Sequence, residues 1–173
     1  MRAVVSDDDG LIAQQIPRLR RYARALTGDR SAADDLVQDT LERALTRYHL
    51  WRRGSDMRAW LFTIMHNIYV NQARSRSRHP LEALDAEPSV EALRGRDPDW
   101  LELRDLAGAL ARIPEEQRVV VLLVGLEQFT YDEAARVLDI PIGTVMSRLS
   151  RGRERLRLLL SGDGNVTPLK VVK

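Results

Sequence analysis

Apolar residues recur along the chain with helical spacing, and no convincing stretch shows the alternation of period two that is typical of strands. The first helical stretch begins near residue 12 and stops at Gly28, a residue well suited to a helix C-cap. Its apolar side chains follow the spacing i, i+3, i+4 and i+7 at Leu19, Tyr22, Ala23 and Leu26. This pattern predicts an all-α protein.

Two further helices are predicted in the first half of the chain. One begins at Ser31, with Asp34 three residues later as a variant capping box. The next is capped by Ser55 or Asp56 and continues to about Arg76. Its apolar residues include Trp60, which we expect to be structural and not a base-stacking side chain.

The composition changes after His79. The segment from 80 to 100 contains three prolines, few large apolar residues and mostly acidic charges, which is typical of a flexible linker. It predicts two small helical units, at 12–79 and 101–161, and a disordered tail at 162–173.

Composition limits the cellular setting and the chemistry. The 173 residues are 44% apolar, which is enough for a core, and they include no cysteine, so a disulfide framework or a thiolate metal site is excluded. The N-terminus lacks a signal pattern, and the longest apolar run, Val119–Leu126, is too short to span a bilayer. We therefore expect a cytoplasmic protein without membrane insertion. Its net charge of +2 conceals acidic and basic blocks that are strongly segregated along the chain.

The most basic segment is PIGTVMSRLSRGRERLR, from 141 to 157, in which five of the last ten residues are arginine. On a helix, one narrow stripe is apolar or small and predicted to be buried: Val145, Leu149, Gly152, Leu156 and Leu159. The opposite face carries Met146, Ser147, Ser150, Arg151 and Glu154. Small and polar side chains flanked by arginines suit a helix that enters the DNA major groove.

The preceding residues supply the other half of a helix-turn-helix. Thr130 and Glu133 form a capping-box pattern for a short helix, and Pro141 prevents that helix from continuing. Gly143 and Thr144 then open the arginine-rich helix, where free backbone N–H groups could bind a phosphate. The two halves together predict a DNA-binding unit.

Three motifs carry a resemblance to a known family. The stretch GTVMSRLSRGRERLR, with IPEEQRVVVLL upstream, resembles region 4 of bacterial sigma factors. DDLVQDTLERAL resembles region 2.2 of the sigma-70 family, and DMRAWLFTIMHNIYVNQARSR resembles regions 2.3 and 2.4. Their order, with only a short linker between them, is similar to that of the extracytoplasmic-function (group 4) sigma factors. The resemblance implies a sigma-2-like helical bundle joined by the linker to a sigma-4-like helix-turn-helix domain.

The resemblance also implies a function. Such a protein is an alternative sigma factor, not an enzyme, and needs no cofactor or metal. It binds core RNA polymerase through the β′ coiled coil and the β flap, reads the −35 and −10 promoter elements, and aids promoter melting. An anti-sigma factor is an expected further partner, and the free chain is expected to be monomeric.

Site residues follow from matching positions in this sequence. Binding of the −35 element is assigned to Thr144, Met146, Ser147, Arg148, Ser150, Arg151, Arg153 and Arg155. Binding of the −10 element is assigned to Asn67, Asn71, Arg74, Arg76 and Arg78. Binding of core polymerase is assigned to an acidic face made of Asp35, Gln38, Asp39 and Glu42. Met146 departs from the family, which often has lysine or arginine there, so the preferred −35 bases stay open.

Other functions fit the sequence less well. A sigma-like interaction protein could sequester an anti-sigma regulator without directing transcription. An unrelated helix-turn-helix repressor leaves the first 79 residues unexplained. An enzyme is the weakest alternative, because His49, His66 and His79 lack ligand-like spacing and no nucleophile motif or phosphate loop is present.

Overall fold

The computed structural model describes residues 7–78 and 99–161, and in these ranges every regular element is a helix. The elements are α1 (Asp7–Thr27), α2 (Arg30–Thr46), the 3-10 helix η1 (Tyr48–Leu50), α3 (Met57–Arg78), α4 (Asp99–Arg112), α5 (Glu115–Val121), the π-helical η4 (Leu122–Leu126), α6 (Tyr131–Leu138) and α7 (Ile142–Leu160). The predicted all-α fold is confirmed. The predicted linker, apart from the start of α4, and the predicted tail lie outside the described residues.

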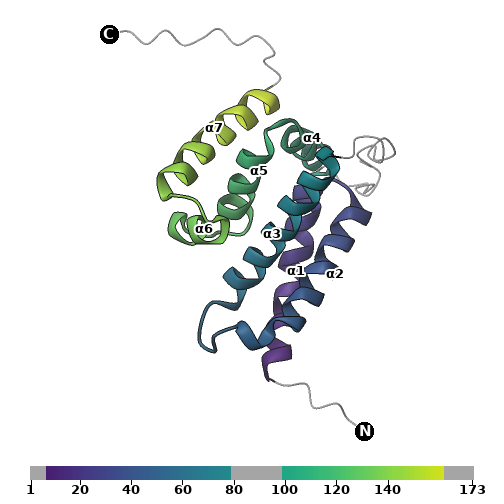
Figure 1. The fold of residues 1–173 in the computed structure, drawn as a ribbon. Coiled ribbons are helices and arrows are strands. Elements are labelled where there is room, and N and C mark those ends of the chain that lie inside the picture. Colours follow the sequence, from purple (N-terminus) through teal and green to yellow (C-terminus); the bar gives the residue numbers. More distant parts are fainter. Residues whose placement is uncertain (1–6, 79–98, 162–173) are drawn as a thin grey trace.

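The N-terminal unit is a bundle of α1, α2 and α3 (Figure 1). Gly28 ends α1 with φ of 71°, as expected of a C-cap glycine. The predicted start of α2 at Ser31 was wrong. Asp29 is the N-cap instead, since its side chain accepts a hydrogen bond of 2.7 Å from the backbone N–H of Ala32. At α3, the Asp56 carboxylate accepts from the Ala59 N–H at 3.2 Å and fills the predicted capping role.

The C-terminal unit packs α7 on α5, with α6 beneath them (Figure 1). The predicted capping box of α6 is present: the backbone N–H of Glu133 donates to the Thr130 hydroxyl, and the Thr130 N–H donates to the Glu133 carboxylate. Asp139 closes α6 in the left-handed conformation, with φ of 52°. This reverses the chain at the turn, and α7 begins one residue after Pro141.

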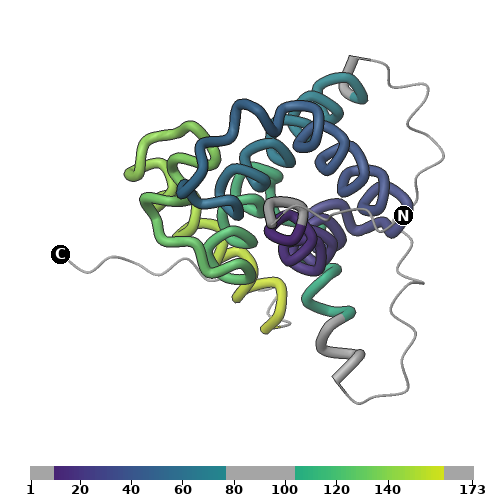
Figure 2. The backbone as a smooth tube through the Cα atoms, turned by 90° about the horizontal axis from the view of Figure 1, so that it is seen from below, coloured from purple at the N-terminus to yellow at the C-terminus, as the bar shows by residue number. Residues whose placement is uncertain are grey.

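The two units pack directly against each other, an arrangement that the sequence did not reveal. Figure 2 shows α3 of the first unit running close to the α5–α6 part of the second, and buried side chains from both units belong to one hydrophobic cluster. The ring of Phe62 on α3 contacts Tyr22 of α1 on one side and Phe129 of the second unit on the other, with centroids 5.1 and 5.2 Å apart. The core is therefore continuous across the two units.

Candidate nucleic-acid interface

The inner face of α7 is fixed by close packing on α5. Val145, Leu149, Gly152 and Leu156 are buried as predicted, whereas Leu159, which was also predicted to be buried, is only half-buried near the end of α7. A Cβ atom at residue 152 would lie 2.7 Å from Cγ2 of Val121 and 3.3 Å from Cβ of Gln117. A larger residue would require the Val121 side chain or one of the helices to shift. The close packing sets the rotation of α7 and so directs its opposite face outward.

The exposed surface of α7 carries residues of the predicted −35 set. Met146, Ser150, Arg151 and Arg153 are exposed. Neither Arg151 nor Arg153 makes a hydrogen bond or ion pair with any residue that the structure describes. Glu154 does not neutralise them, because its carboxylate is held by Arg157 at 2.7 and 3.1 Å. These contacts lower the pKa of Glu154 below its ordinary value.

Two other predicted −35 arginines are engaged with α5. Arg148 donates to the Glu116 carboxylate at 3.1 Å, and Arg155 donates to the side-chain oxygen of Gln117 at 3.2 Å. Burial and, to a smaller extent, the charge of Arg148 lower the pKa of His66 on α3. Half-buried Ser147 donates its hydroxyl hydrogen to the carbonyl of Thr144 at 3.1 Å. The predicted −35 residues therefore include side chains that point outward and side chains that hold α7 against α5.

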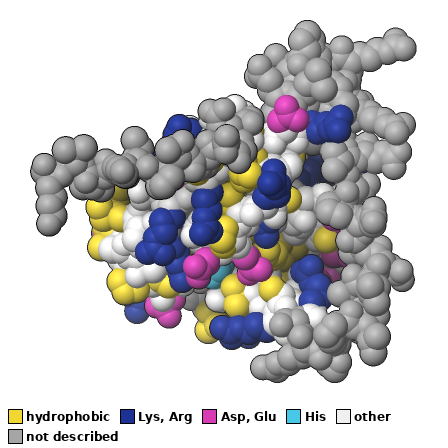
Figure 3. Space-filling view, turned by 90° about the horizontal axis from the view of Figure 1, so that it is seen from above, with side chains coloured by type: hydrophobic (Ala, Val, Ile, Leu, Met, Phe, Trp, Pro, Cys, Tyr) yellow, Lys and Arg dark blue, Asp and Glu magenta, His cyan; other side chains and the backbone are white. Residues whose placement is uncertain are grey.

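Basic side chains are spread over the face seen in Figure 3, among apolar and a few acidic ones. No single block of one sign covers this face. Charge alone would attract a nucleic acid without fixing its register, so the direction of individual arginines on α7 matters more than their number.

The predicted −10 residues lie on α3 but not all on one side of it. Asn67, Asn71 and Arg74 are exposed and fall within one stripe at about 100° per residue. Arg76 is exposed about half a turn away, and its charge acts on Tyr69, whose pKa is raised by burial against the opposing effects of Arg118 and Arg76. The side chain of Arg78 lies outside the described residues. The structure thus brings together three of the five.

The predicted polymerase face on α2 is exposed at all four positions, Asp35, Gln38, Asp39 and Glu42. Gln38 donates to Glu42 at 3.0 Å, and Gln72 of α3 donates to Asp39 at 3.0 Å. Leu45, which was not assigned to this face from the sequence, is 57% exposed and continues it one turn after Leu41 and Glu42. An exposed leucine beside carboxylates makes the face suitable for a protein partner.

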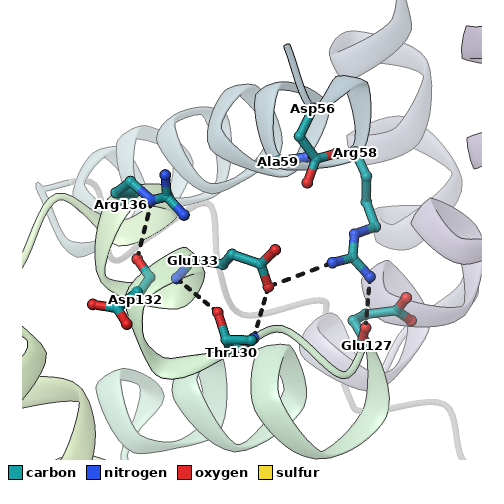
Figure 4. A network of polar contacts seen from close by, with 8 residues as sticks. All are labelled: Asp56, Arg58, Ala59, Glu127, Thr130, Asp132, Glu133 and Arg136. Carbon is teal, nitrogen blue, oxygen red and sulfur yellow. Dashed lines mark hydrogen bonds and ion pairs between the residues drawn. The ribbon is translucent and has the colours of Figure 1, made fainter. Parts of the chain in front are cut away.

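The seam between the units, formed by Arg21, Arg58, Phe62, Glu127 and Phe129, was not found from the sequence. The buried carboxylate of Glu127 accepts from Nε and Nη2 of Arg21 at 3.1 and 2.9 Å, while the Glu127 backbone carbonyl accepts from Arg58 at 3.2 Å. Figure 4 shows Arg58 reaching from α3 to Glu127 and to the capping residue Glu133, 3.7 Å away. The Arg58 guanidinium also lies 4.0 Å from the centroid of the Phe129 ring.

Comparison with known proteins matches both units. Residues 12–66 match the family "Sigma2 domain of PhyR", and residues 103–156 match "Sigma-70, region 4". The chain is 39% identical over 160 residues to the ECF RNA polymerase sigma factor EcfG of Rhodopseudomonas palustris, covering 91% of this chain and 86% of that protein. The chain belongs to the ECF RNA polymerase sigma factors. Sigma factors of this family act in transcription initiation and are not enzymes in the usual sense.

Solved structures agree with this assignment. The sigma factor RpoE of Bartonella quintana, crystallised with the anti-sigma factor NepR, superposes with a TM-score of 0.81 and 37% identity over 92% of this chain and 99% of that one. CnrH, solved with the cytosolic domain of CnrY, gives a TM-score of 0.66 and 28% identity over 90% of this chain and 88% of that one. Both the fold and the order of the two units are thus those of sigma factors.

Two features are absent from the described parts of the chain. No helix there is long and apolar enough to cross a membrane. No group of three or more histidine, aspartate or glutamate side chains is placed to hold a metal ion in the same residues.

Proposed function

We propose that this sigma factor reads the −35 element with the outer face of α7 and the −10 element with α3. The observation that carries the proposal is the outward direction of Arg151 and Arg153, which have no partner in the described residues and flank small and apolar side chains on the second helix of a helix-turn-helix. Arg151 is the base-contacting candidate. Arg153 lies on the other flank of the exposed face, about 160° around the helix from Arg151, where it is placed for a phosphate.

The −10 proposal rests on the stripe formed by Asn67, Asn71 and Arg74. Two amides at helical spacing can hydrogen-bond an unstacked base, and the arginine that follows can meet the phosphate backbone of the melted strand. Arg148 and Arg155 act differently in this account: they brace α7 against α5, and their loss affects the angle of the helix more than any base contact.

Polymerase binding is proposed for the acidic face of α2. Its carboxylates at Asp35, Asp39 and Glu42 are open to a basic partner, and Leu45 supplies apolar area beside them. Following the family resemblance, this face meets the β′ coiled coil, the second unit meets the β flap, and the protein joins the polymerase as a monomer. An anti-sigma partner is proposed because RpoE and CnrH were both solved with a partner.

Transcription in vitro tests the function. The full chain is added to bacterial core RNA polymerase on a library of genomic fragments, and the start sites are mapped by sequencing the transcripts. Discrete start sites that require the protein and follow a shared two-part motif would support the proposal. Binding to core polymerase without new start sites would contradict it.

The second candidate function is sequestration of an anti-sigma regulator. The observation that favours it is the match of residues 12–66 to a domain of PhyR. The outward arginines of α7 oppose it, because a protein that only captures a regulator has no use for unpaired cations on a DNA-reading helix. The start-site experiment separates the two functions, since sequestration alone produces no transcripts.

A further inference from the structure

The first turn of α7 exposes apolar side chains beside the buried stripe of the helix. Ile142, the first residue of the helix, is 42% exposed, and Met146, one turn later, is 52% exposed. Residues four apart on a helix lie on the same side, so these two form an apolar edge that Ser150 continues. Exposing two large apolar side chains to water is unfavourable, and nothing in the packing of the described residues requires it.

The surroundings of this edge indicate which partner covers it. The edge lies at the N-terminal end of the second helix of a helix-turn-helix, the part that reaches base edges in the major groove. Arg151 and Arg153, without partners in the described residues, follow on the same helix and complement a polyanion. A protein surface with apolar character would not need these two cations on the same helix. The DNA major groove fits both features.

Only one group in the major groove is apolar. Thymine presents a 5-methyl group there, whereas guanine, cytosine and adenine present hydrogen-bonding atoms. Side chains four residues apart on a helix are separated by about 6 Å at Cβ, close to two base-pair steps of about 3.4 Å each. Ile142 and Met146 can therefore reach the methyl groups of neighbouring or next-neighbouring base pairs.

We propose that Ile142 and Met146 form a thymine-reading edge, in which each side chain packs against the 5-methyl group of a thymine in the −35 element. This inference rests on the proposed promoter-reading role of α7 and adds which chemical group of the bases the helix selects. Lysine or arginine at residue 146 would favour the acceptors of guanine, so methionine shifts the preference towards A·T pairs, each of which carries one thymine.

Replacement of thymine by uracil tests the proposal, because it removes only the methyl group. Holoenzyme is assembled from the full chain and core polymerase, and a promoter located by start-site mapping is used as the probe. Each thymine of the −35 element, on either strand, is replaced singly by uracil, and binding is measured by competition. Loss of one buried methyl contact predicts about fourfold weaker binding at one or two positions. Uracil in the spacer between the elements is the DNA control.

Protein variants then assign the contacts. Met146→Ala and Ile142→Ala should each weaken binding to the thymine promoter and abolish the uracil effect at one position, while Met146→Leu should keep it. Leu160→Ala is the matched control, because Leu160 is a similarly exposed apolar residue (48%) at the other end of α7. Met146→Lys should move the preference at its position towards guanine.

The outcomes are separable. Uracil substitutions that are neutral throughout the −35 element, or that remain harmful in both alanine variants, would overturn the thymine-reading edge. Alanine variants that lose affinity for core polymerase, with no uracil effect, would assign the edge to a protein contact and overturn the proposal as well. A holoenzyme that produces no start sites would instead contradict the promoter-reading function itself.

Discussion

Arginines at the seam and arginines on the outer face of α7 belong to the same residue type but differ in every contact. Arg21 and Arg58 each hold Glu127, through its carboxylate and its backbone carbonyl, and Arg58 also lies over Phe129. Arg151 and Arg153 hold nothing that the structure describes. The difference shows that the number of arginines in a segment does not reveal their role. The partners that the fold brings to each one do.

The comparison also separates the two tasks of the molecule. Arg21 pairs with the buried carboxylate of Glu127 and Arg58 with its backbone carbonyl, and both contacts contribute to the packing of one unit on the other. Outer arginines are available to a ligand from outside. Substitutions at the seam should therefore change stability, whereas substitutions on the outer surfaces should change binding.

Arg21→Ala should have the largest effect on stability. The Glu127 side chain is 0% exposed. Without Arg21, its carboxylate loses the two hydrogen bonds from Nε and Nη2 of that arginine and is left as a buried charge. Because Arg21 itself is 53% exposed, we expect a cost of about 2–3 kcal/mol in the free energy of unfolding, below the range for fully buried pairs. Chemical denaturation of the full chain measures it. Arg20→Ala, an exposed neighbour, should cost less than about 0.5 kcal/mol, and equal losses would contradict the role of the seam.

Replacing the glycines on the two sides of α7 by alanine should give the next largest change in the free energy of unfolding. Gly152→Ala should destabilise by about 1–2 kcal/mol, because overpacking against Val121 outweighs the gain in helix propensity. Gly143→Ala, where a Cβ would meet nothing within 4 Å, should instead stabilise by up to about 1 kcal/mol. Thermal unfolding of both variants measures the difference. Effects of the same sign would show that α7 does not pack as described.

Thr130→Ala should cost about 1 kcal/mol, because it removes half of the capping box that starts α6. The Thr130 backbone N–H, as the largest cause, lowers the pKa of Glu133 below its ordinary value. A lowered pKa means that this contribution to stability is present above the ordinary glutamate pKa and is lost as the pH falls through the folded value. Thr130→Ala keeps that backbone N–H, so its deficit should change little with pH, whereas the deficit of Glu133→Gln, measured by denaturation at several pH values, should shrink in acid. A Glu133→Gln deficit that stays constant would contradict the link to the Glu133 carboxylate.

Asp39→Arg on the outer face of α2 should have the smallest effect. We expect binding to core polymerase to weaken by about fivefold at low salt, with little change in the stability of the isolated chain. Asp105→Arg makes the same charge change at an exposed position of α4 and is the control. Fluorescence titration with core polymerase measures both affinities. Equal weakening by both variants would mean that net charge, not the α2 face, decides binding.

Local signals explain what could be predicted from the sequence. Helical spacing, the Thr130–Glu133 box and the apolar stripe of α7 depend on residues close in sequence, and the structure has each of them. The start of α2 was misassigned because Asp29 and Ser31 are both good caps, and only the geometry selects Asp29. The family resemblance was needed to assign the acidic face of α2 and the amides of α3, since both resemble ordinary solvated surface.

Long-range contacts explain what could not be predicted. Arg21 meets Glu127 across 106 residues of sequence, and Arg58 meets it across 69, so no local pattern links them. The one available signal was a carboxylate next to an otherwise apolar run, at Glu127. Arg148 was expected to pack or to meet a phosphate, and its partner could not be named: it lies 3.1 Å from Glu116, and neither position indicates this pairing in the sequence.

The most direct test of the central claim, that the outer face of α7 reads the −35 bases, is a binding measurement on a randomised −35 library. Holoenzyme with wild-type protein or with Arg151→Ala is allowed to select from the library, and the bound fragments are sequenced. The account predicts that Arg151→Ala costs about 1–3 kcal/mol and relaxes discrimination at one base pair. A uniform loss over all sequences would make Arg151 a phosphate contact, and no loss would contradict the assignment of α7 as the promoter-reading helix.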